Sequence, residues 1–173
     1  MIDFEPYIEY IRQSFKDYTR CLVKQKVKTD YTEIIVIVPS VYPPRPLTFG
    51  ELGIKFDEDT IGFFGDFFSD DYIDWDDNSW EKYSKEEILQ LLDEKIVEYK
   101  HYIDYGYFFA FYDKNNDRQR LWPYVYTGDI NKIDYKAVYL DQRTRDEISY
   151  DQIKSVTVSN FYGDIIVDNK ILN

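Results

Sequence analysis

The segment from residue 84 to residue 103, SKEEILQLLDEKIVEYKHYI, restricts the fold more than any other stretch of the chain. Ser84 followed by Glu87 is the signature of a capping box, in which both side chains hydrogen-bond backbone N–H groups at a helix start. Apolar residues then recur at intervals of three and four, on what would be one helical face: Ile88, Leu91, Leu92, Ile96, Tyr99 and Ile103. We therefore expect a long amphipathic helix with one buried face.

A second amphipathic helix is predicted near the N-terminus, in residues 4–23. Pro6 suits the first turn of a helix, where the missing N–H costs nothing. The apolar residues again follow the three-and-four spacing: Phe4, Tyr7, Ile8, Ile11, Phe15, Tyr18 and Leu22. Residues 32–39, TEIIVIVP, form an unbroken β-branched run that ends in proline. Such a run favours a central strand buried on both faces.

Residues 105–126 are rich in aromatic side chains on either side of a polar turn at residues 114–117, which predicts two strands of a hairpin. The turn also resembles the start of a calcium-binding EF-hand loop, because Asp113, Asn115 and Asp117 match its first three ligand positions. Arg118 stands where that loop requires glycine. We therefore expect a hairpin turn without calcium.

Further short strands are predicted at residues 136–141, 155–161 and 164–172, where β-branched or aromatic residues lie between turn-forming ones. Helices mixed with such strands define the α+β class. The expected architecture is two amphipathic helices packed on a largely antiparallel β-sheet, with residues 1–173 forming a single domain.

Composition limits the class of protein. With 44% hydrophobic and 19% aromatic residues, a chain of 173 residues can bury a substantial core and is not expected to be disordered. The N-terminal residues lack the basic and apolar pattern of a signal peptide, and no run of about 18 apolar residues occurs. Cys21 is the only cysteine, so no internal disulfide can form. These features predict a cytoplasmic protein without a membrane segment.

The chemistry of most active sites is missing from the sequence. Nucleophilic triads and most metal sites combine histidine or cysteine residues, and this chain has one of each, His101 and Cys21. His101 falls opposite the apolar face of its helix, which predicts a solvated imidazole, and Cys21 is expected to be mostly buried. Neither glycine-rich phosphate motif occurs, and a net charge of -12 repels nucleic acid. We predict no catalytic residue, cofactor or metal, and no direct nucleic-acid binding.

The negative charge is concentrated in residues 57–81, DEDTIGFFGDFFSDDYIDWDDNSWE, which contain ten acidic side chains, seven aromatic rings and no Lys or Arg. Outside this segment the 33 acidic residues fall to 23, close to the 21 basic ones. Solubility alone would not require such concentration. Four phenylalanines of the segment are expected to turn inward as core: Phe63, Phe64, Phe67 and Phe68.

The second half of the segment has too few aliphatic residues for a core strand, and its rings are interleaved with aspartates. Tyrosine and tryptophan are enriched at binding hot spots, and concentrated acid attracts basic partners. The predicted partner-binding residues are Asp70, Asp71, Tyr72, Asp74, Trp75, Asp76, Asp77, Trp80 and Glu81. The partner we expect is a basic protein, such as one with a cleft built for nucleic-acid phosphates.

A small acidic α+β protein that combines such a surface with no catalytic motif is similar in type to bacterial immunity proteins, which neutralise a toxin. The leading hypothesis is therefore an immunity-type inhibitor of a basic, nuclease-like toxin. One alternative is a nucleic-acid mimic that blocks a restriction enzyme or another DNA-handling enzyme, which should space its carboxylates evenly over a long face. The other is a carboxylate-dependent enzyme, which should have paired acids in a deep pocket.

Overall fold

The computed structural model of the protein describes residues 3–37, 51–57, 61–64, 83–119, 125–142 and 148–172. Within these residues, three α-helices and two antiparallel sheets of four and three strands make the fold α+β. The chain divides into two compact units, with the described residues up to Lys100 in the first and those from His101 in the second. The prediction that residues 1–173 form a single domain stays a prediction.

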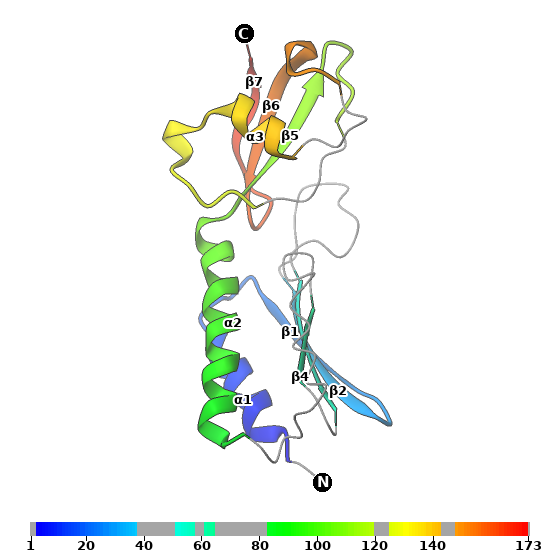
Figure 1. Ribbon diagram of the computed structural model, residues 1–173, viewed down its shortest axis with the longest axis vertical. Helices are drawn as coiled ribbons and strands as arrows, with labels where there is room; N and C mark the ends of the chain where they lie inside the picture. Colours follow the sequence, from blue (N-terminus) through cyan, green and yellow to red (C-terminus); the bar gives the residue numbers. More distant parts are fainter. Residues whose placement is uncertain are drawn as a thin grey trace. The chain divides into compact units, whose positions relative to one another are not determined.

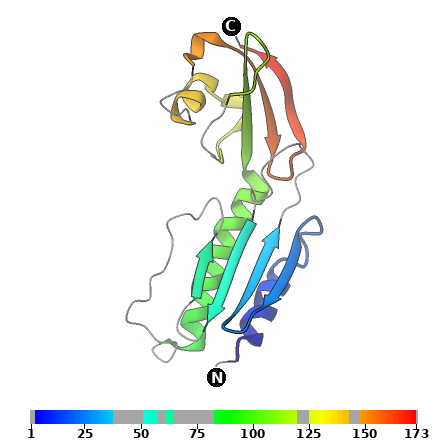
Figure 2. The ribbon, with the colours of Figure 1, turned by 90° about the vertical axis from the view of Figure 1, so that its right-hand side faces the viewer.

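The first unit contains two helices and a four-stranded sheet: α1 (Glu5–Ser14), β1 (Leu22–Val27), β2 (Tyr31–Ile37), β3 (Glu51–Asp57), β4 (Ile61–Phe64) and most of α2 (Lys85–Tyr105). The strands pair antiparallel in the order β1-β2-β3-β4. Both helices lie on the same side of this sheet (Figures 1 and 2). Within the described residues, the sheet therefore has one helix-covered face and one face without helices.

The central strand expected from the β-branched run is confirmed as β2, which lies between β1 and β3. Three consecutive residues, Ile34, Ile35 and Val36, are all buried. Because successive side chains of a strand point to opposite faces, this run requires cover on both faces of the sheet at that point.

The helix expected from residue 84 is present as α2. The Ser84 hydroxyl accepts a hydrogen bond from the Glu87 N–H at 3.2 Å, and the Glu87 carboxylate accepts one from the Ser84 N–H at 2.7 Å, which confirms the capping box. The buried stripe comprises Ile88, Leu92, Ile96, Tyr99 and Ile103. Leu91, which was expected in the stripe, is only partly buried.

Aromatic contacts join both helices to the sheet. Tyr7 of α1 stacks on Phe56 of β3 with ring centroids 6.4 Å apart. Phe15, just after α1, meets Tyr99 of α2 edge to face at 6.0 Å. The Tyr99 hydroxyl donates to the carbonyl oxygen of Val36 at 3.4 Å. Since tyrosine and phenylalanine bury large areas, these contacts hold both helices on one face of the sheet.

The predicted N-terminal helix is too long, because α1 ends at Ser14. The N–H groups of Phe15 and Lys16 bond carbonyls three residues back, which tightens the chain into a turn and stops the helix. Leu22, expected on the helical face, instead begins β1 and is 48% exposed. The segment becomes a strand because Val23 pairs with Val36 of β2, a tertiary contact that helical periodicity does not predict.

Phe63 is fully buried on the helix-covered face, as expected, but Phe64 is not turned toward the same core. It pairs with Gly53 of β3, and its ring lies where a side chain on Gly53 would be. Phe67 and Phe68 lie outside the described residues. The ring of Phe64 therefore covers a glycine on the face of the sheet without helices.

We expect Gly53→Ala to lower the free energy of unfolding by about 1–3 kcal/mol, because the new methyl group would overlap the Phe64 ring and force it aside. Gly62→Ala is the matched control, since a Cβ there would meet only the Lys55 Cβ at 3.9 Å. The control should change stability by less than about 0.5 kcal/mol. Urea unfolding of both variants measures the difference, and equal effects would contradict the stacking of Phe64 on Gly53.

The second unit contains the end of α2 and a three-stranded antiparallel sheet in the order β5-β6-β7, with one further α-helix and two short 3-10 helices: β5 (Tyr107–Asp113), η2 (Ile130–Lys132), α3 (Tyr135–Gln142), η3 (Tyr150–Gln152), β6 (Ile153–Asn160) and β7 (Ile165–Ile171). The expected strands at 155–161 and 164–172 are thus β6 and β7. The single sheet expected from the sequence is two sheets.

The polar turn after β5 is the hairpin turn that the sequence predicts. The Asp113 carboxylate accepts hydrogen bonds from the N–H groups of Asn115 and Asp117, at 2.8 and 2.9 Å. Asn116 adopts the left-handed conformation, with φ of 69°, which asparagine tolerates in turns. After the turn, the described residues form isolated bridges at Arg118 and Tyr126 in place of a second regular strand.

Residues 136–141, predicted as a strand, lie in α3. The Asp134 carboxylate caps this helix, because it accepts hydrogen bonds from the N–H groups of Lys136 and Ala137 at 3.0 and 3.1 Å. The cap outweighs the β-propensity of Val138 and Tyr139, and both become buried on the side of the helix that meets the sheet.

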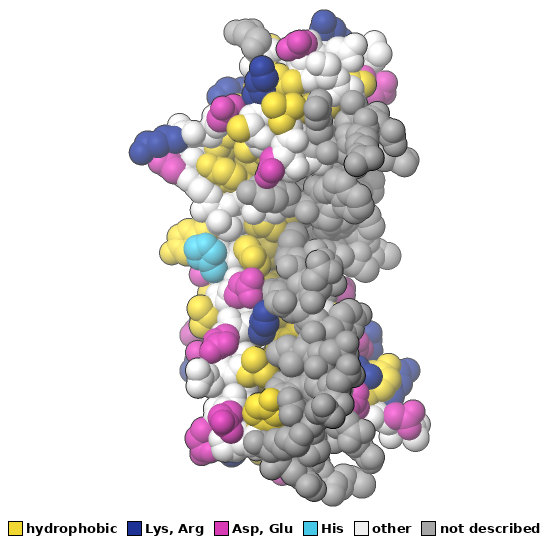
Figure 3. Space-filling view, in the orientation of Figure 1, with side chains coloured by type: hydrophobic (Ala, Val, Ile, Leu, Met, Phe, Trp, Pro, Cys, Tyr) yellow, Lys and Arg dark blue, Asp and Glu magenta, His cyan; other side chains and the backbone are white. Residues whose placement is uncertain are grey.

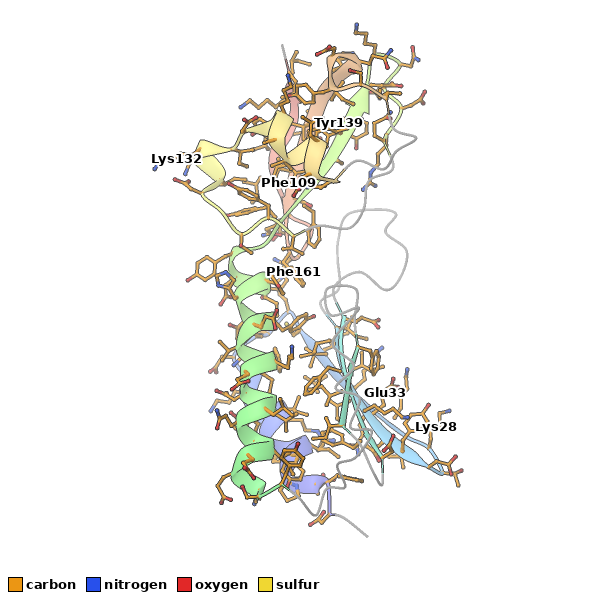
Figure 4. All side chains as sticks on the ribbon, in the orientation of Figure 1. Lys28, Glu33, Phe109, Lys132, Tyr139 and Phe161 are labelled. Carbon is orange, nitrogen blue, oxygen red and sulfur yellow. The ribbon has the colours of Figure 1, made fainter. Side chains whose placement is uncertain are left out.

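The core of the second unit lies between α3 and one face of its sheet. Tyr139 meets Phe111 edge to face with centroids 5.1 Å apart, and its hydroxyl donates to the carbonyl oxygen of Ile148 at 2.8 Å. Figure 4 shows Tyr139 and Phe109 in this region, between the yellow helix and the strands. Phe109, Val156 and Val158 complete the centre of the cluster.

Candidate functional site

The acidic segment begins in the sheet of the first unit. Its first residue, Asp57, ends β3, and its carboxylate lies 3.1 Å from the Lys55 ammonium. Ile61 and Phe63 of β4 are buried against the helices, 2% and 0% exposed. The opening part of the segment, residues 57 and 61–64, is therefore structural.

At its other end, the segment leads into α2. Ser84 and Glu87 satisfy each other's backbone N–H groups there, so the helix start is well defined. The hydrogen bonds from the Ser84 N–H and hydroxyl hold the pKa of Glu87 below its usual value. Residues 65–82 thus connect the end of β4 to the capped start of α2 within the same unit.

This pKa shift sets an expected pH dependence. A carboxyl group whose folded-state pKa is depressed stabilises the fold above its unfolded-state pKa, and the contribution is lost as pH falls through the lower folded-state value. Glu87→Gln keeps a capping-box residue but removes the titration. The wild type should be the more stable of the two at pH 7, and the gap should close as pH is lowered from 7 through the depressed pKa of Glu87. Urea unfolding across this range would contradict the linkage if the gap stayed constant.

The nine predicted partner-binding residues, Asp70, Asp71, Tyr72, Asp74, Trp75, Asp76, Asp77, Trp80 and Glu81, lie outside the described residues. Their role as a binding surface stays a prediction.

The face of the four-stranded sheet without helices carries paired charges. Lys26 of β1 lies 3.4 Å from the Glu33 carboxylate of β2. Lys55 of β3 contacts Asp57 and also lies over the ring of Tyr31, 4.8 Å from its centroid. In Figure 4, Glu33 and Lys28 lie on the β1–β2 hairpin. This face is a network of both charge signs over the strands.

Sequence reasoning missed the lysines of β1 because it extended the first helix to residue 23 and assigned no element to residues 24–28. The signal was present, since residues 23–28 read Val-Lys-Gln-Lys-Val-Lys, an alternation with period two, followed by Thr29 and Asp30 as turn residues. Lys24, Lys26 and Lys28 are all exposed. On the face seen in Figure 3, Lys and Arg side chains lie near Asp and Glu side chains at several places.

His101 and Cys21 are the single histidine and the single cysteine of the chain. His101 is exposed, as expected, with its ring 5.1 Å from that of Tyr105 on the same helix. Cys21 is half-buried and not mostly buried, and it lies in the turn before β1, where its N–H donates to the Tyr18 carbonyl oxygen at 2.8 Å. Within the described residues, no three or more His, Cys, Asp or Glu side chains are grouped so that they could hold a metal ion.

Three tyrosines are less acidic than usual. The hydroxyl of Tyr10 on α1 donates to the Asp93 carboxylate on α2 at 2.6 Å, and this hydrogen bond raises the pKa of Tyr10. Burial, with a smaller contribution from a nearby carboxylate, raises the pKa of Tyr7 and of Tyr150. These groups stay protonated at neutral pH, so each acts as a hydrogen-bond donor or packing group.

None of the helices in the described part of the chain has the length and apolar character needed to cross a lipid bilayer.

The chain matches no protein-family model, no curated protein and no solved structure with which it was compared.

Proposed function

We propose that this protein is an immunity-type inhibitor that binds and neutralises a basic, nuclease-like bacterial toxin. The observation that carries the proposal is residues 57–81, where ten acidic and seven aromatic side chains occur without a single Lys or Arg. The remainder of the chain is nearly balanced in charge, so the negative field is directed from one segment. A toxin that cleaves nucleic acid must carry the opposite charge in its cleft.

The two residue types in the segment have different tasks in this proposal. The carboxylates of Asp70, Asp71, Asp74, Asp76 and Asp77 steer a basic partner and raise its association rate. The rings of Tyr72, Trp75 and Trp80 supply apolar contact area at the centre of the interface, where hot-spot residues cluster. Blocking the cleft physically then inhibits the toxin without any catalytic step in the inhibitor.

The attachment of the segment supports this proposal. Residues 65–82 start directly after β4 and end at a capped helix of the same compact unit. Fixing both ends of a loop reduces the conformational freedom that binding must remove, which favours affinity. In the same proposal the protein acts in the cytoplasm as one domain with helices packed on sheet, needs no cofactor, and does not bind nucleic acid itself.

The experiment compares three tagged baits in native lysate: the wild type, a stretch variant and a control variant. The stretch variant has Asp70, Asp71, Asp74, Asp76 and Asp77 changed to Asn or Ser. The control variant makes the same charge change at exposed positions elsewhere: Asp17→Asn, Glu94→Gln, Asp141→Asn, Asp151→Asn and Asp168→Asn. Proteins captured by the wild type and the control, but not by the stretch variant, are identified by mass spectrometry.

The captured protein must then be purified and assayed for nuclease activity with and without the inhibitor. A basic toxin whose activity falls on addition of the wild type supports the proposal. Capture and inhibition of a restriction enzyme or another DNA-handling enzyme would replace it with the nucleic-acid mimic. Equal capture by all three baits would show that the acidic segment is not part of the interface. If the protein itself turned over a substrate and the stretch variant did not, the protein would be a carboxylate-dependent enzyme.

A further inference from the structure

β1 is an edge strand with an unusually regular backbone. Among the described strands it pairs only with β2, and all six of its residues are in continuous register with that strand. The edge strand β7 has two register shifts, β5 has one near its end, and β4 has four residues. β5 is also in continuous register over six residues, but the bridges of Tyr107 to Tyr126 and of Tyr112 to Arg118 lie at its other edge. Among the edge strands of the described residues, β1 therefore presents a regular edge without a further bridge. Regular edges are the ones to which another strand can be added.

The backbone groups that β1 presents can be assigned from its hairpin. The Lys28 N–H donates to the Tyr31 carbonyl oxygen at 2.8 Å, which makes this a hydrogen-bonded pair. Hydrogen-bonded and non-hydrogen-bonded pairs alternate along an antiparallel ladder. In the observed register, the N–H and C=O groups of Val23, Gln25 and Val27 are therefore directed away from β2. They form a row of backbone donors and acceptors at the edge.

The charge around this edge is opposite to that of the whole protein. Residues 12–28 contain six basic side chains and one acidic one, in a chain whose net charge is -12. Lys24 and Lys26 share the face of the sheet without helices, and Lys28 lies at the tip of the hairpin (Figure 4). Lys26 pairs with Glu33, while Lys24 is exposed and has no ion pair within the described residues. Within the part of the chain that the structure describes, the edge thus keeps a positive charge at Lys24 that no carboxylate neutralises.

The other face of β1 is apolar at its two ends. Val23 and Val27 lie on this side, and Val27 is 70% exposed. Gln25 lies between them, and its side-chain oxygen accepts a hydrogen bond from the Arg12 guanidinium. A strand placed beside β1 would therefore meet lysines on one face and mainly valines on the other.

We propose that β1 binds an extended peptide segment of a protein partner in which acidic residues alternate with apolar ones, so that the four-stranded sheet gains a fifth strand. Backbone hydrogen bonds to Val23, Gln25 and Val27 would supply affinity, and the alternation of side chains would supply selectivity. Lysines on an edge repel a second basic edge, and the same charge attracts an acidic strand. The proposed site consists of residues of β1, which are not part of the acidic segment in the sequence, and it does not depend on the proposed inhibitor function.

The probe is a short synthetic peptide of alternating Glu and Val with blocked ends, titrated into the full chain and followed by fluorescence anisotropy. Hydrogen exchange of the same complex locates the contact. The amides of Val23, Gln25 and Val27 should exchange rapidly in the free protein and become protected with the peptide. Those of Leu22, Lys24 and Lys26 should be protected in both states, because they face β2.

Charge and backbone contributions are separated by variants. Lys24→Glu with Lys26→Glu should weaken peptide binding about tenfold or more at low salt. Lys114→Glu with Lys136→Glu makes the same charge change at exposed positions of the second unit and should leave binding within about twofold. If the double glutamate variant does not fold, Lys24→Gln with Lys26→Gln should still weaken binding.

Two modified peptides test strand addition directly. One is N-methylated at every valine and the other at every glutamate, which blocks opposite edges of an extended peptide. One of the two should lose binding and the other should retain it, because only one edge can face β1. No binding of the unmodified peptide, equal binding of both methylated peptides, or binding without protection of Val23, Gln25 and Val27 would overturn the proposal. Concentration-dependent dimerisation with protection of the same amides, unaffected by the peptide, would identify a second copy of the chain as the occupant instead.

Discussion

Replacing Leu92 with alanine is expected to lower the free energy of unfolding by about 2–5 kcal/mol. Leu92 lies in the middle of α2, is fully buried, and belongs to the stripe that meets α1 and the sheet. The substitution removes apolar area from the core and leaves a cavity that the surrounding side chains fill only in part. Urea unfolding followed by circular dichroism gives the value.

Two controls on the same helix isolate the effect of burial. Val97 is 57% exposed, so Val97→Ala should change stability by less than about 1 kcal/mol. His101 is also exposed, and His101→Ala should change neither stability nor function. A loss at Val97 equal to that at Leu92 would contradict the assignment of the buried face. Loss of function in a folded His101 variant would contradict a non-enzymatic protein.

The elements that sequence reasoning located are those in which local and tertiary preferences agree. α2 has a capping box and an apolar stripe, and the stripe is what the core of its unit requires. β2 has a β-branched run, both of its edges pair with neighbouring strands, and Ile34, Ile35 and Val36 are buried on both of its faces. The turn after β5 is determined by the side chain of Asp113, which bonds nearby N–H groups whatever the rest of the fold.

The misplaced elements are those in which a distant partner decides. The predicted helix was extended through Leu22 and Val23, but pairing of Val23 with Val36 places both residues in a strand. Residues 136–141 contain β-forming side chains, but the Asp134 cap and the packing of Tyr139 on Phe111 make them helical. β3 was not predicted at all, because Gly53 weakens the strand pattern until the Phe64 ring covers it.

Sequence alone identified the acidic segment as a candidate site because charge and aromatic content can be counted without a fold. It could not identify the β1 edge, since an edge exists only after the order of strands is known. The lysines of β1 can be read in the sequence. Their significance as a binding site depends on the backbone groups that the strand presents at its edge, and these are known only from the structure. A candidate site defined by local composition can be predicted from the sequence, whereas one defined by the order of strands can be identified only in the structure.

Neutralising the five aspartates of the acidic segment is expected to reduce the rate of association with the captured partner by about tenfold or more at low salt. The variant changes Asp70, Asp71, Asp74, Asp76 and Asp77 to Asn or Ser. The reason is long-range attraction between this segment and a basic cleft, which salt screens over roughly 10 Å at 0.1 M. The wild-type association rate should therefore itself fall steeply as salt is added, and the variant's much less.

The control variant at Asp17, Glu94, Asp141, Asp151 and Asp168 separates local from total charge. It changes the net charge by the same amount at exposed positions elsewhere, so its association rate should stay within about threefold of the wild type. Surface plasmon resonance at several salt concentrations measures all three proteins. Equal slowing in both variants would show that only net charge matters.

Trp75→Ala should change the rate of dissociation and not the rate of association. The variant keeps every charge but removes a ring that we expect to be desolvated at the centre of the interface, so it should cost about 2 kcal/mol or more. This loss should appear as faster dissociation, with an association rate close to that of the wild type, because short-range contacts form after the partner has been steered in. The same sensorgrams give both rates. If the aspartate and tryptophan variants are folded by circular dichroism and bind with unchanged kinetics, the acidic segment is a solvated loop and the functional surface lies elsewhere on the chain.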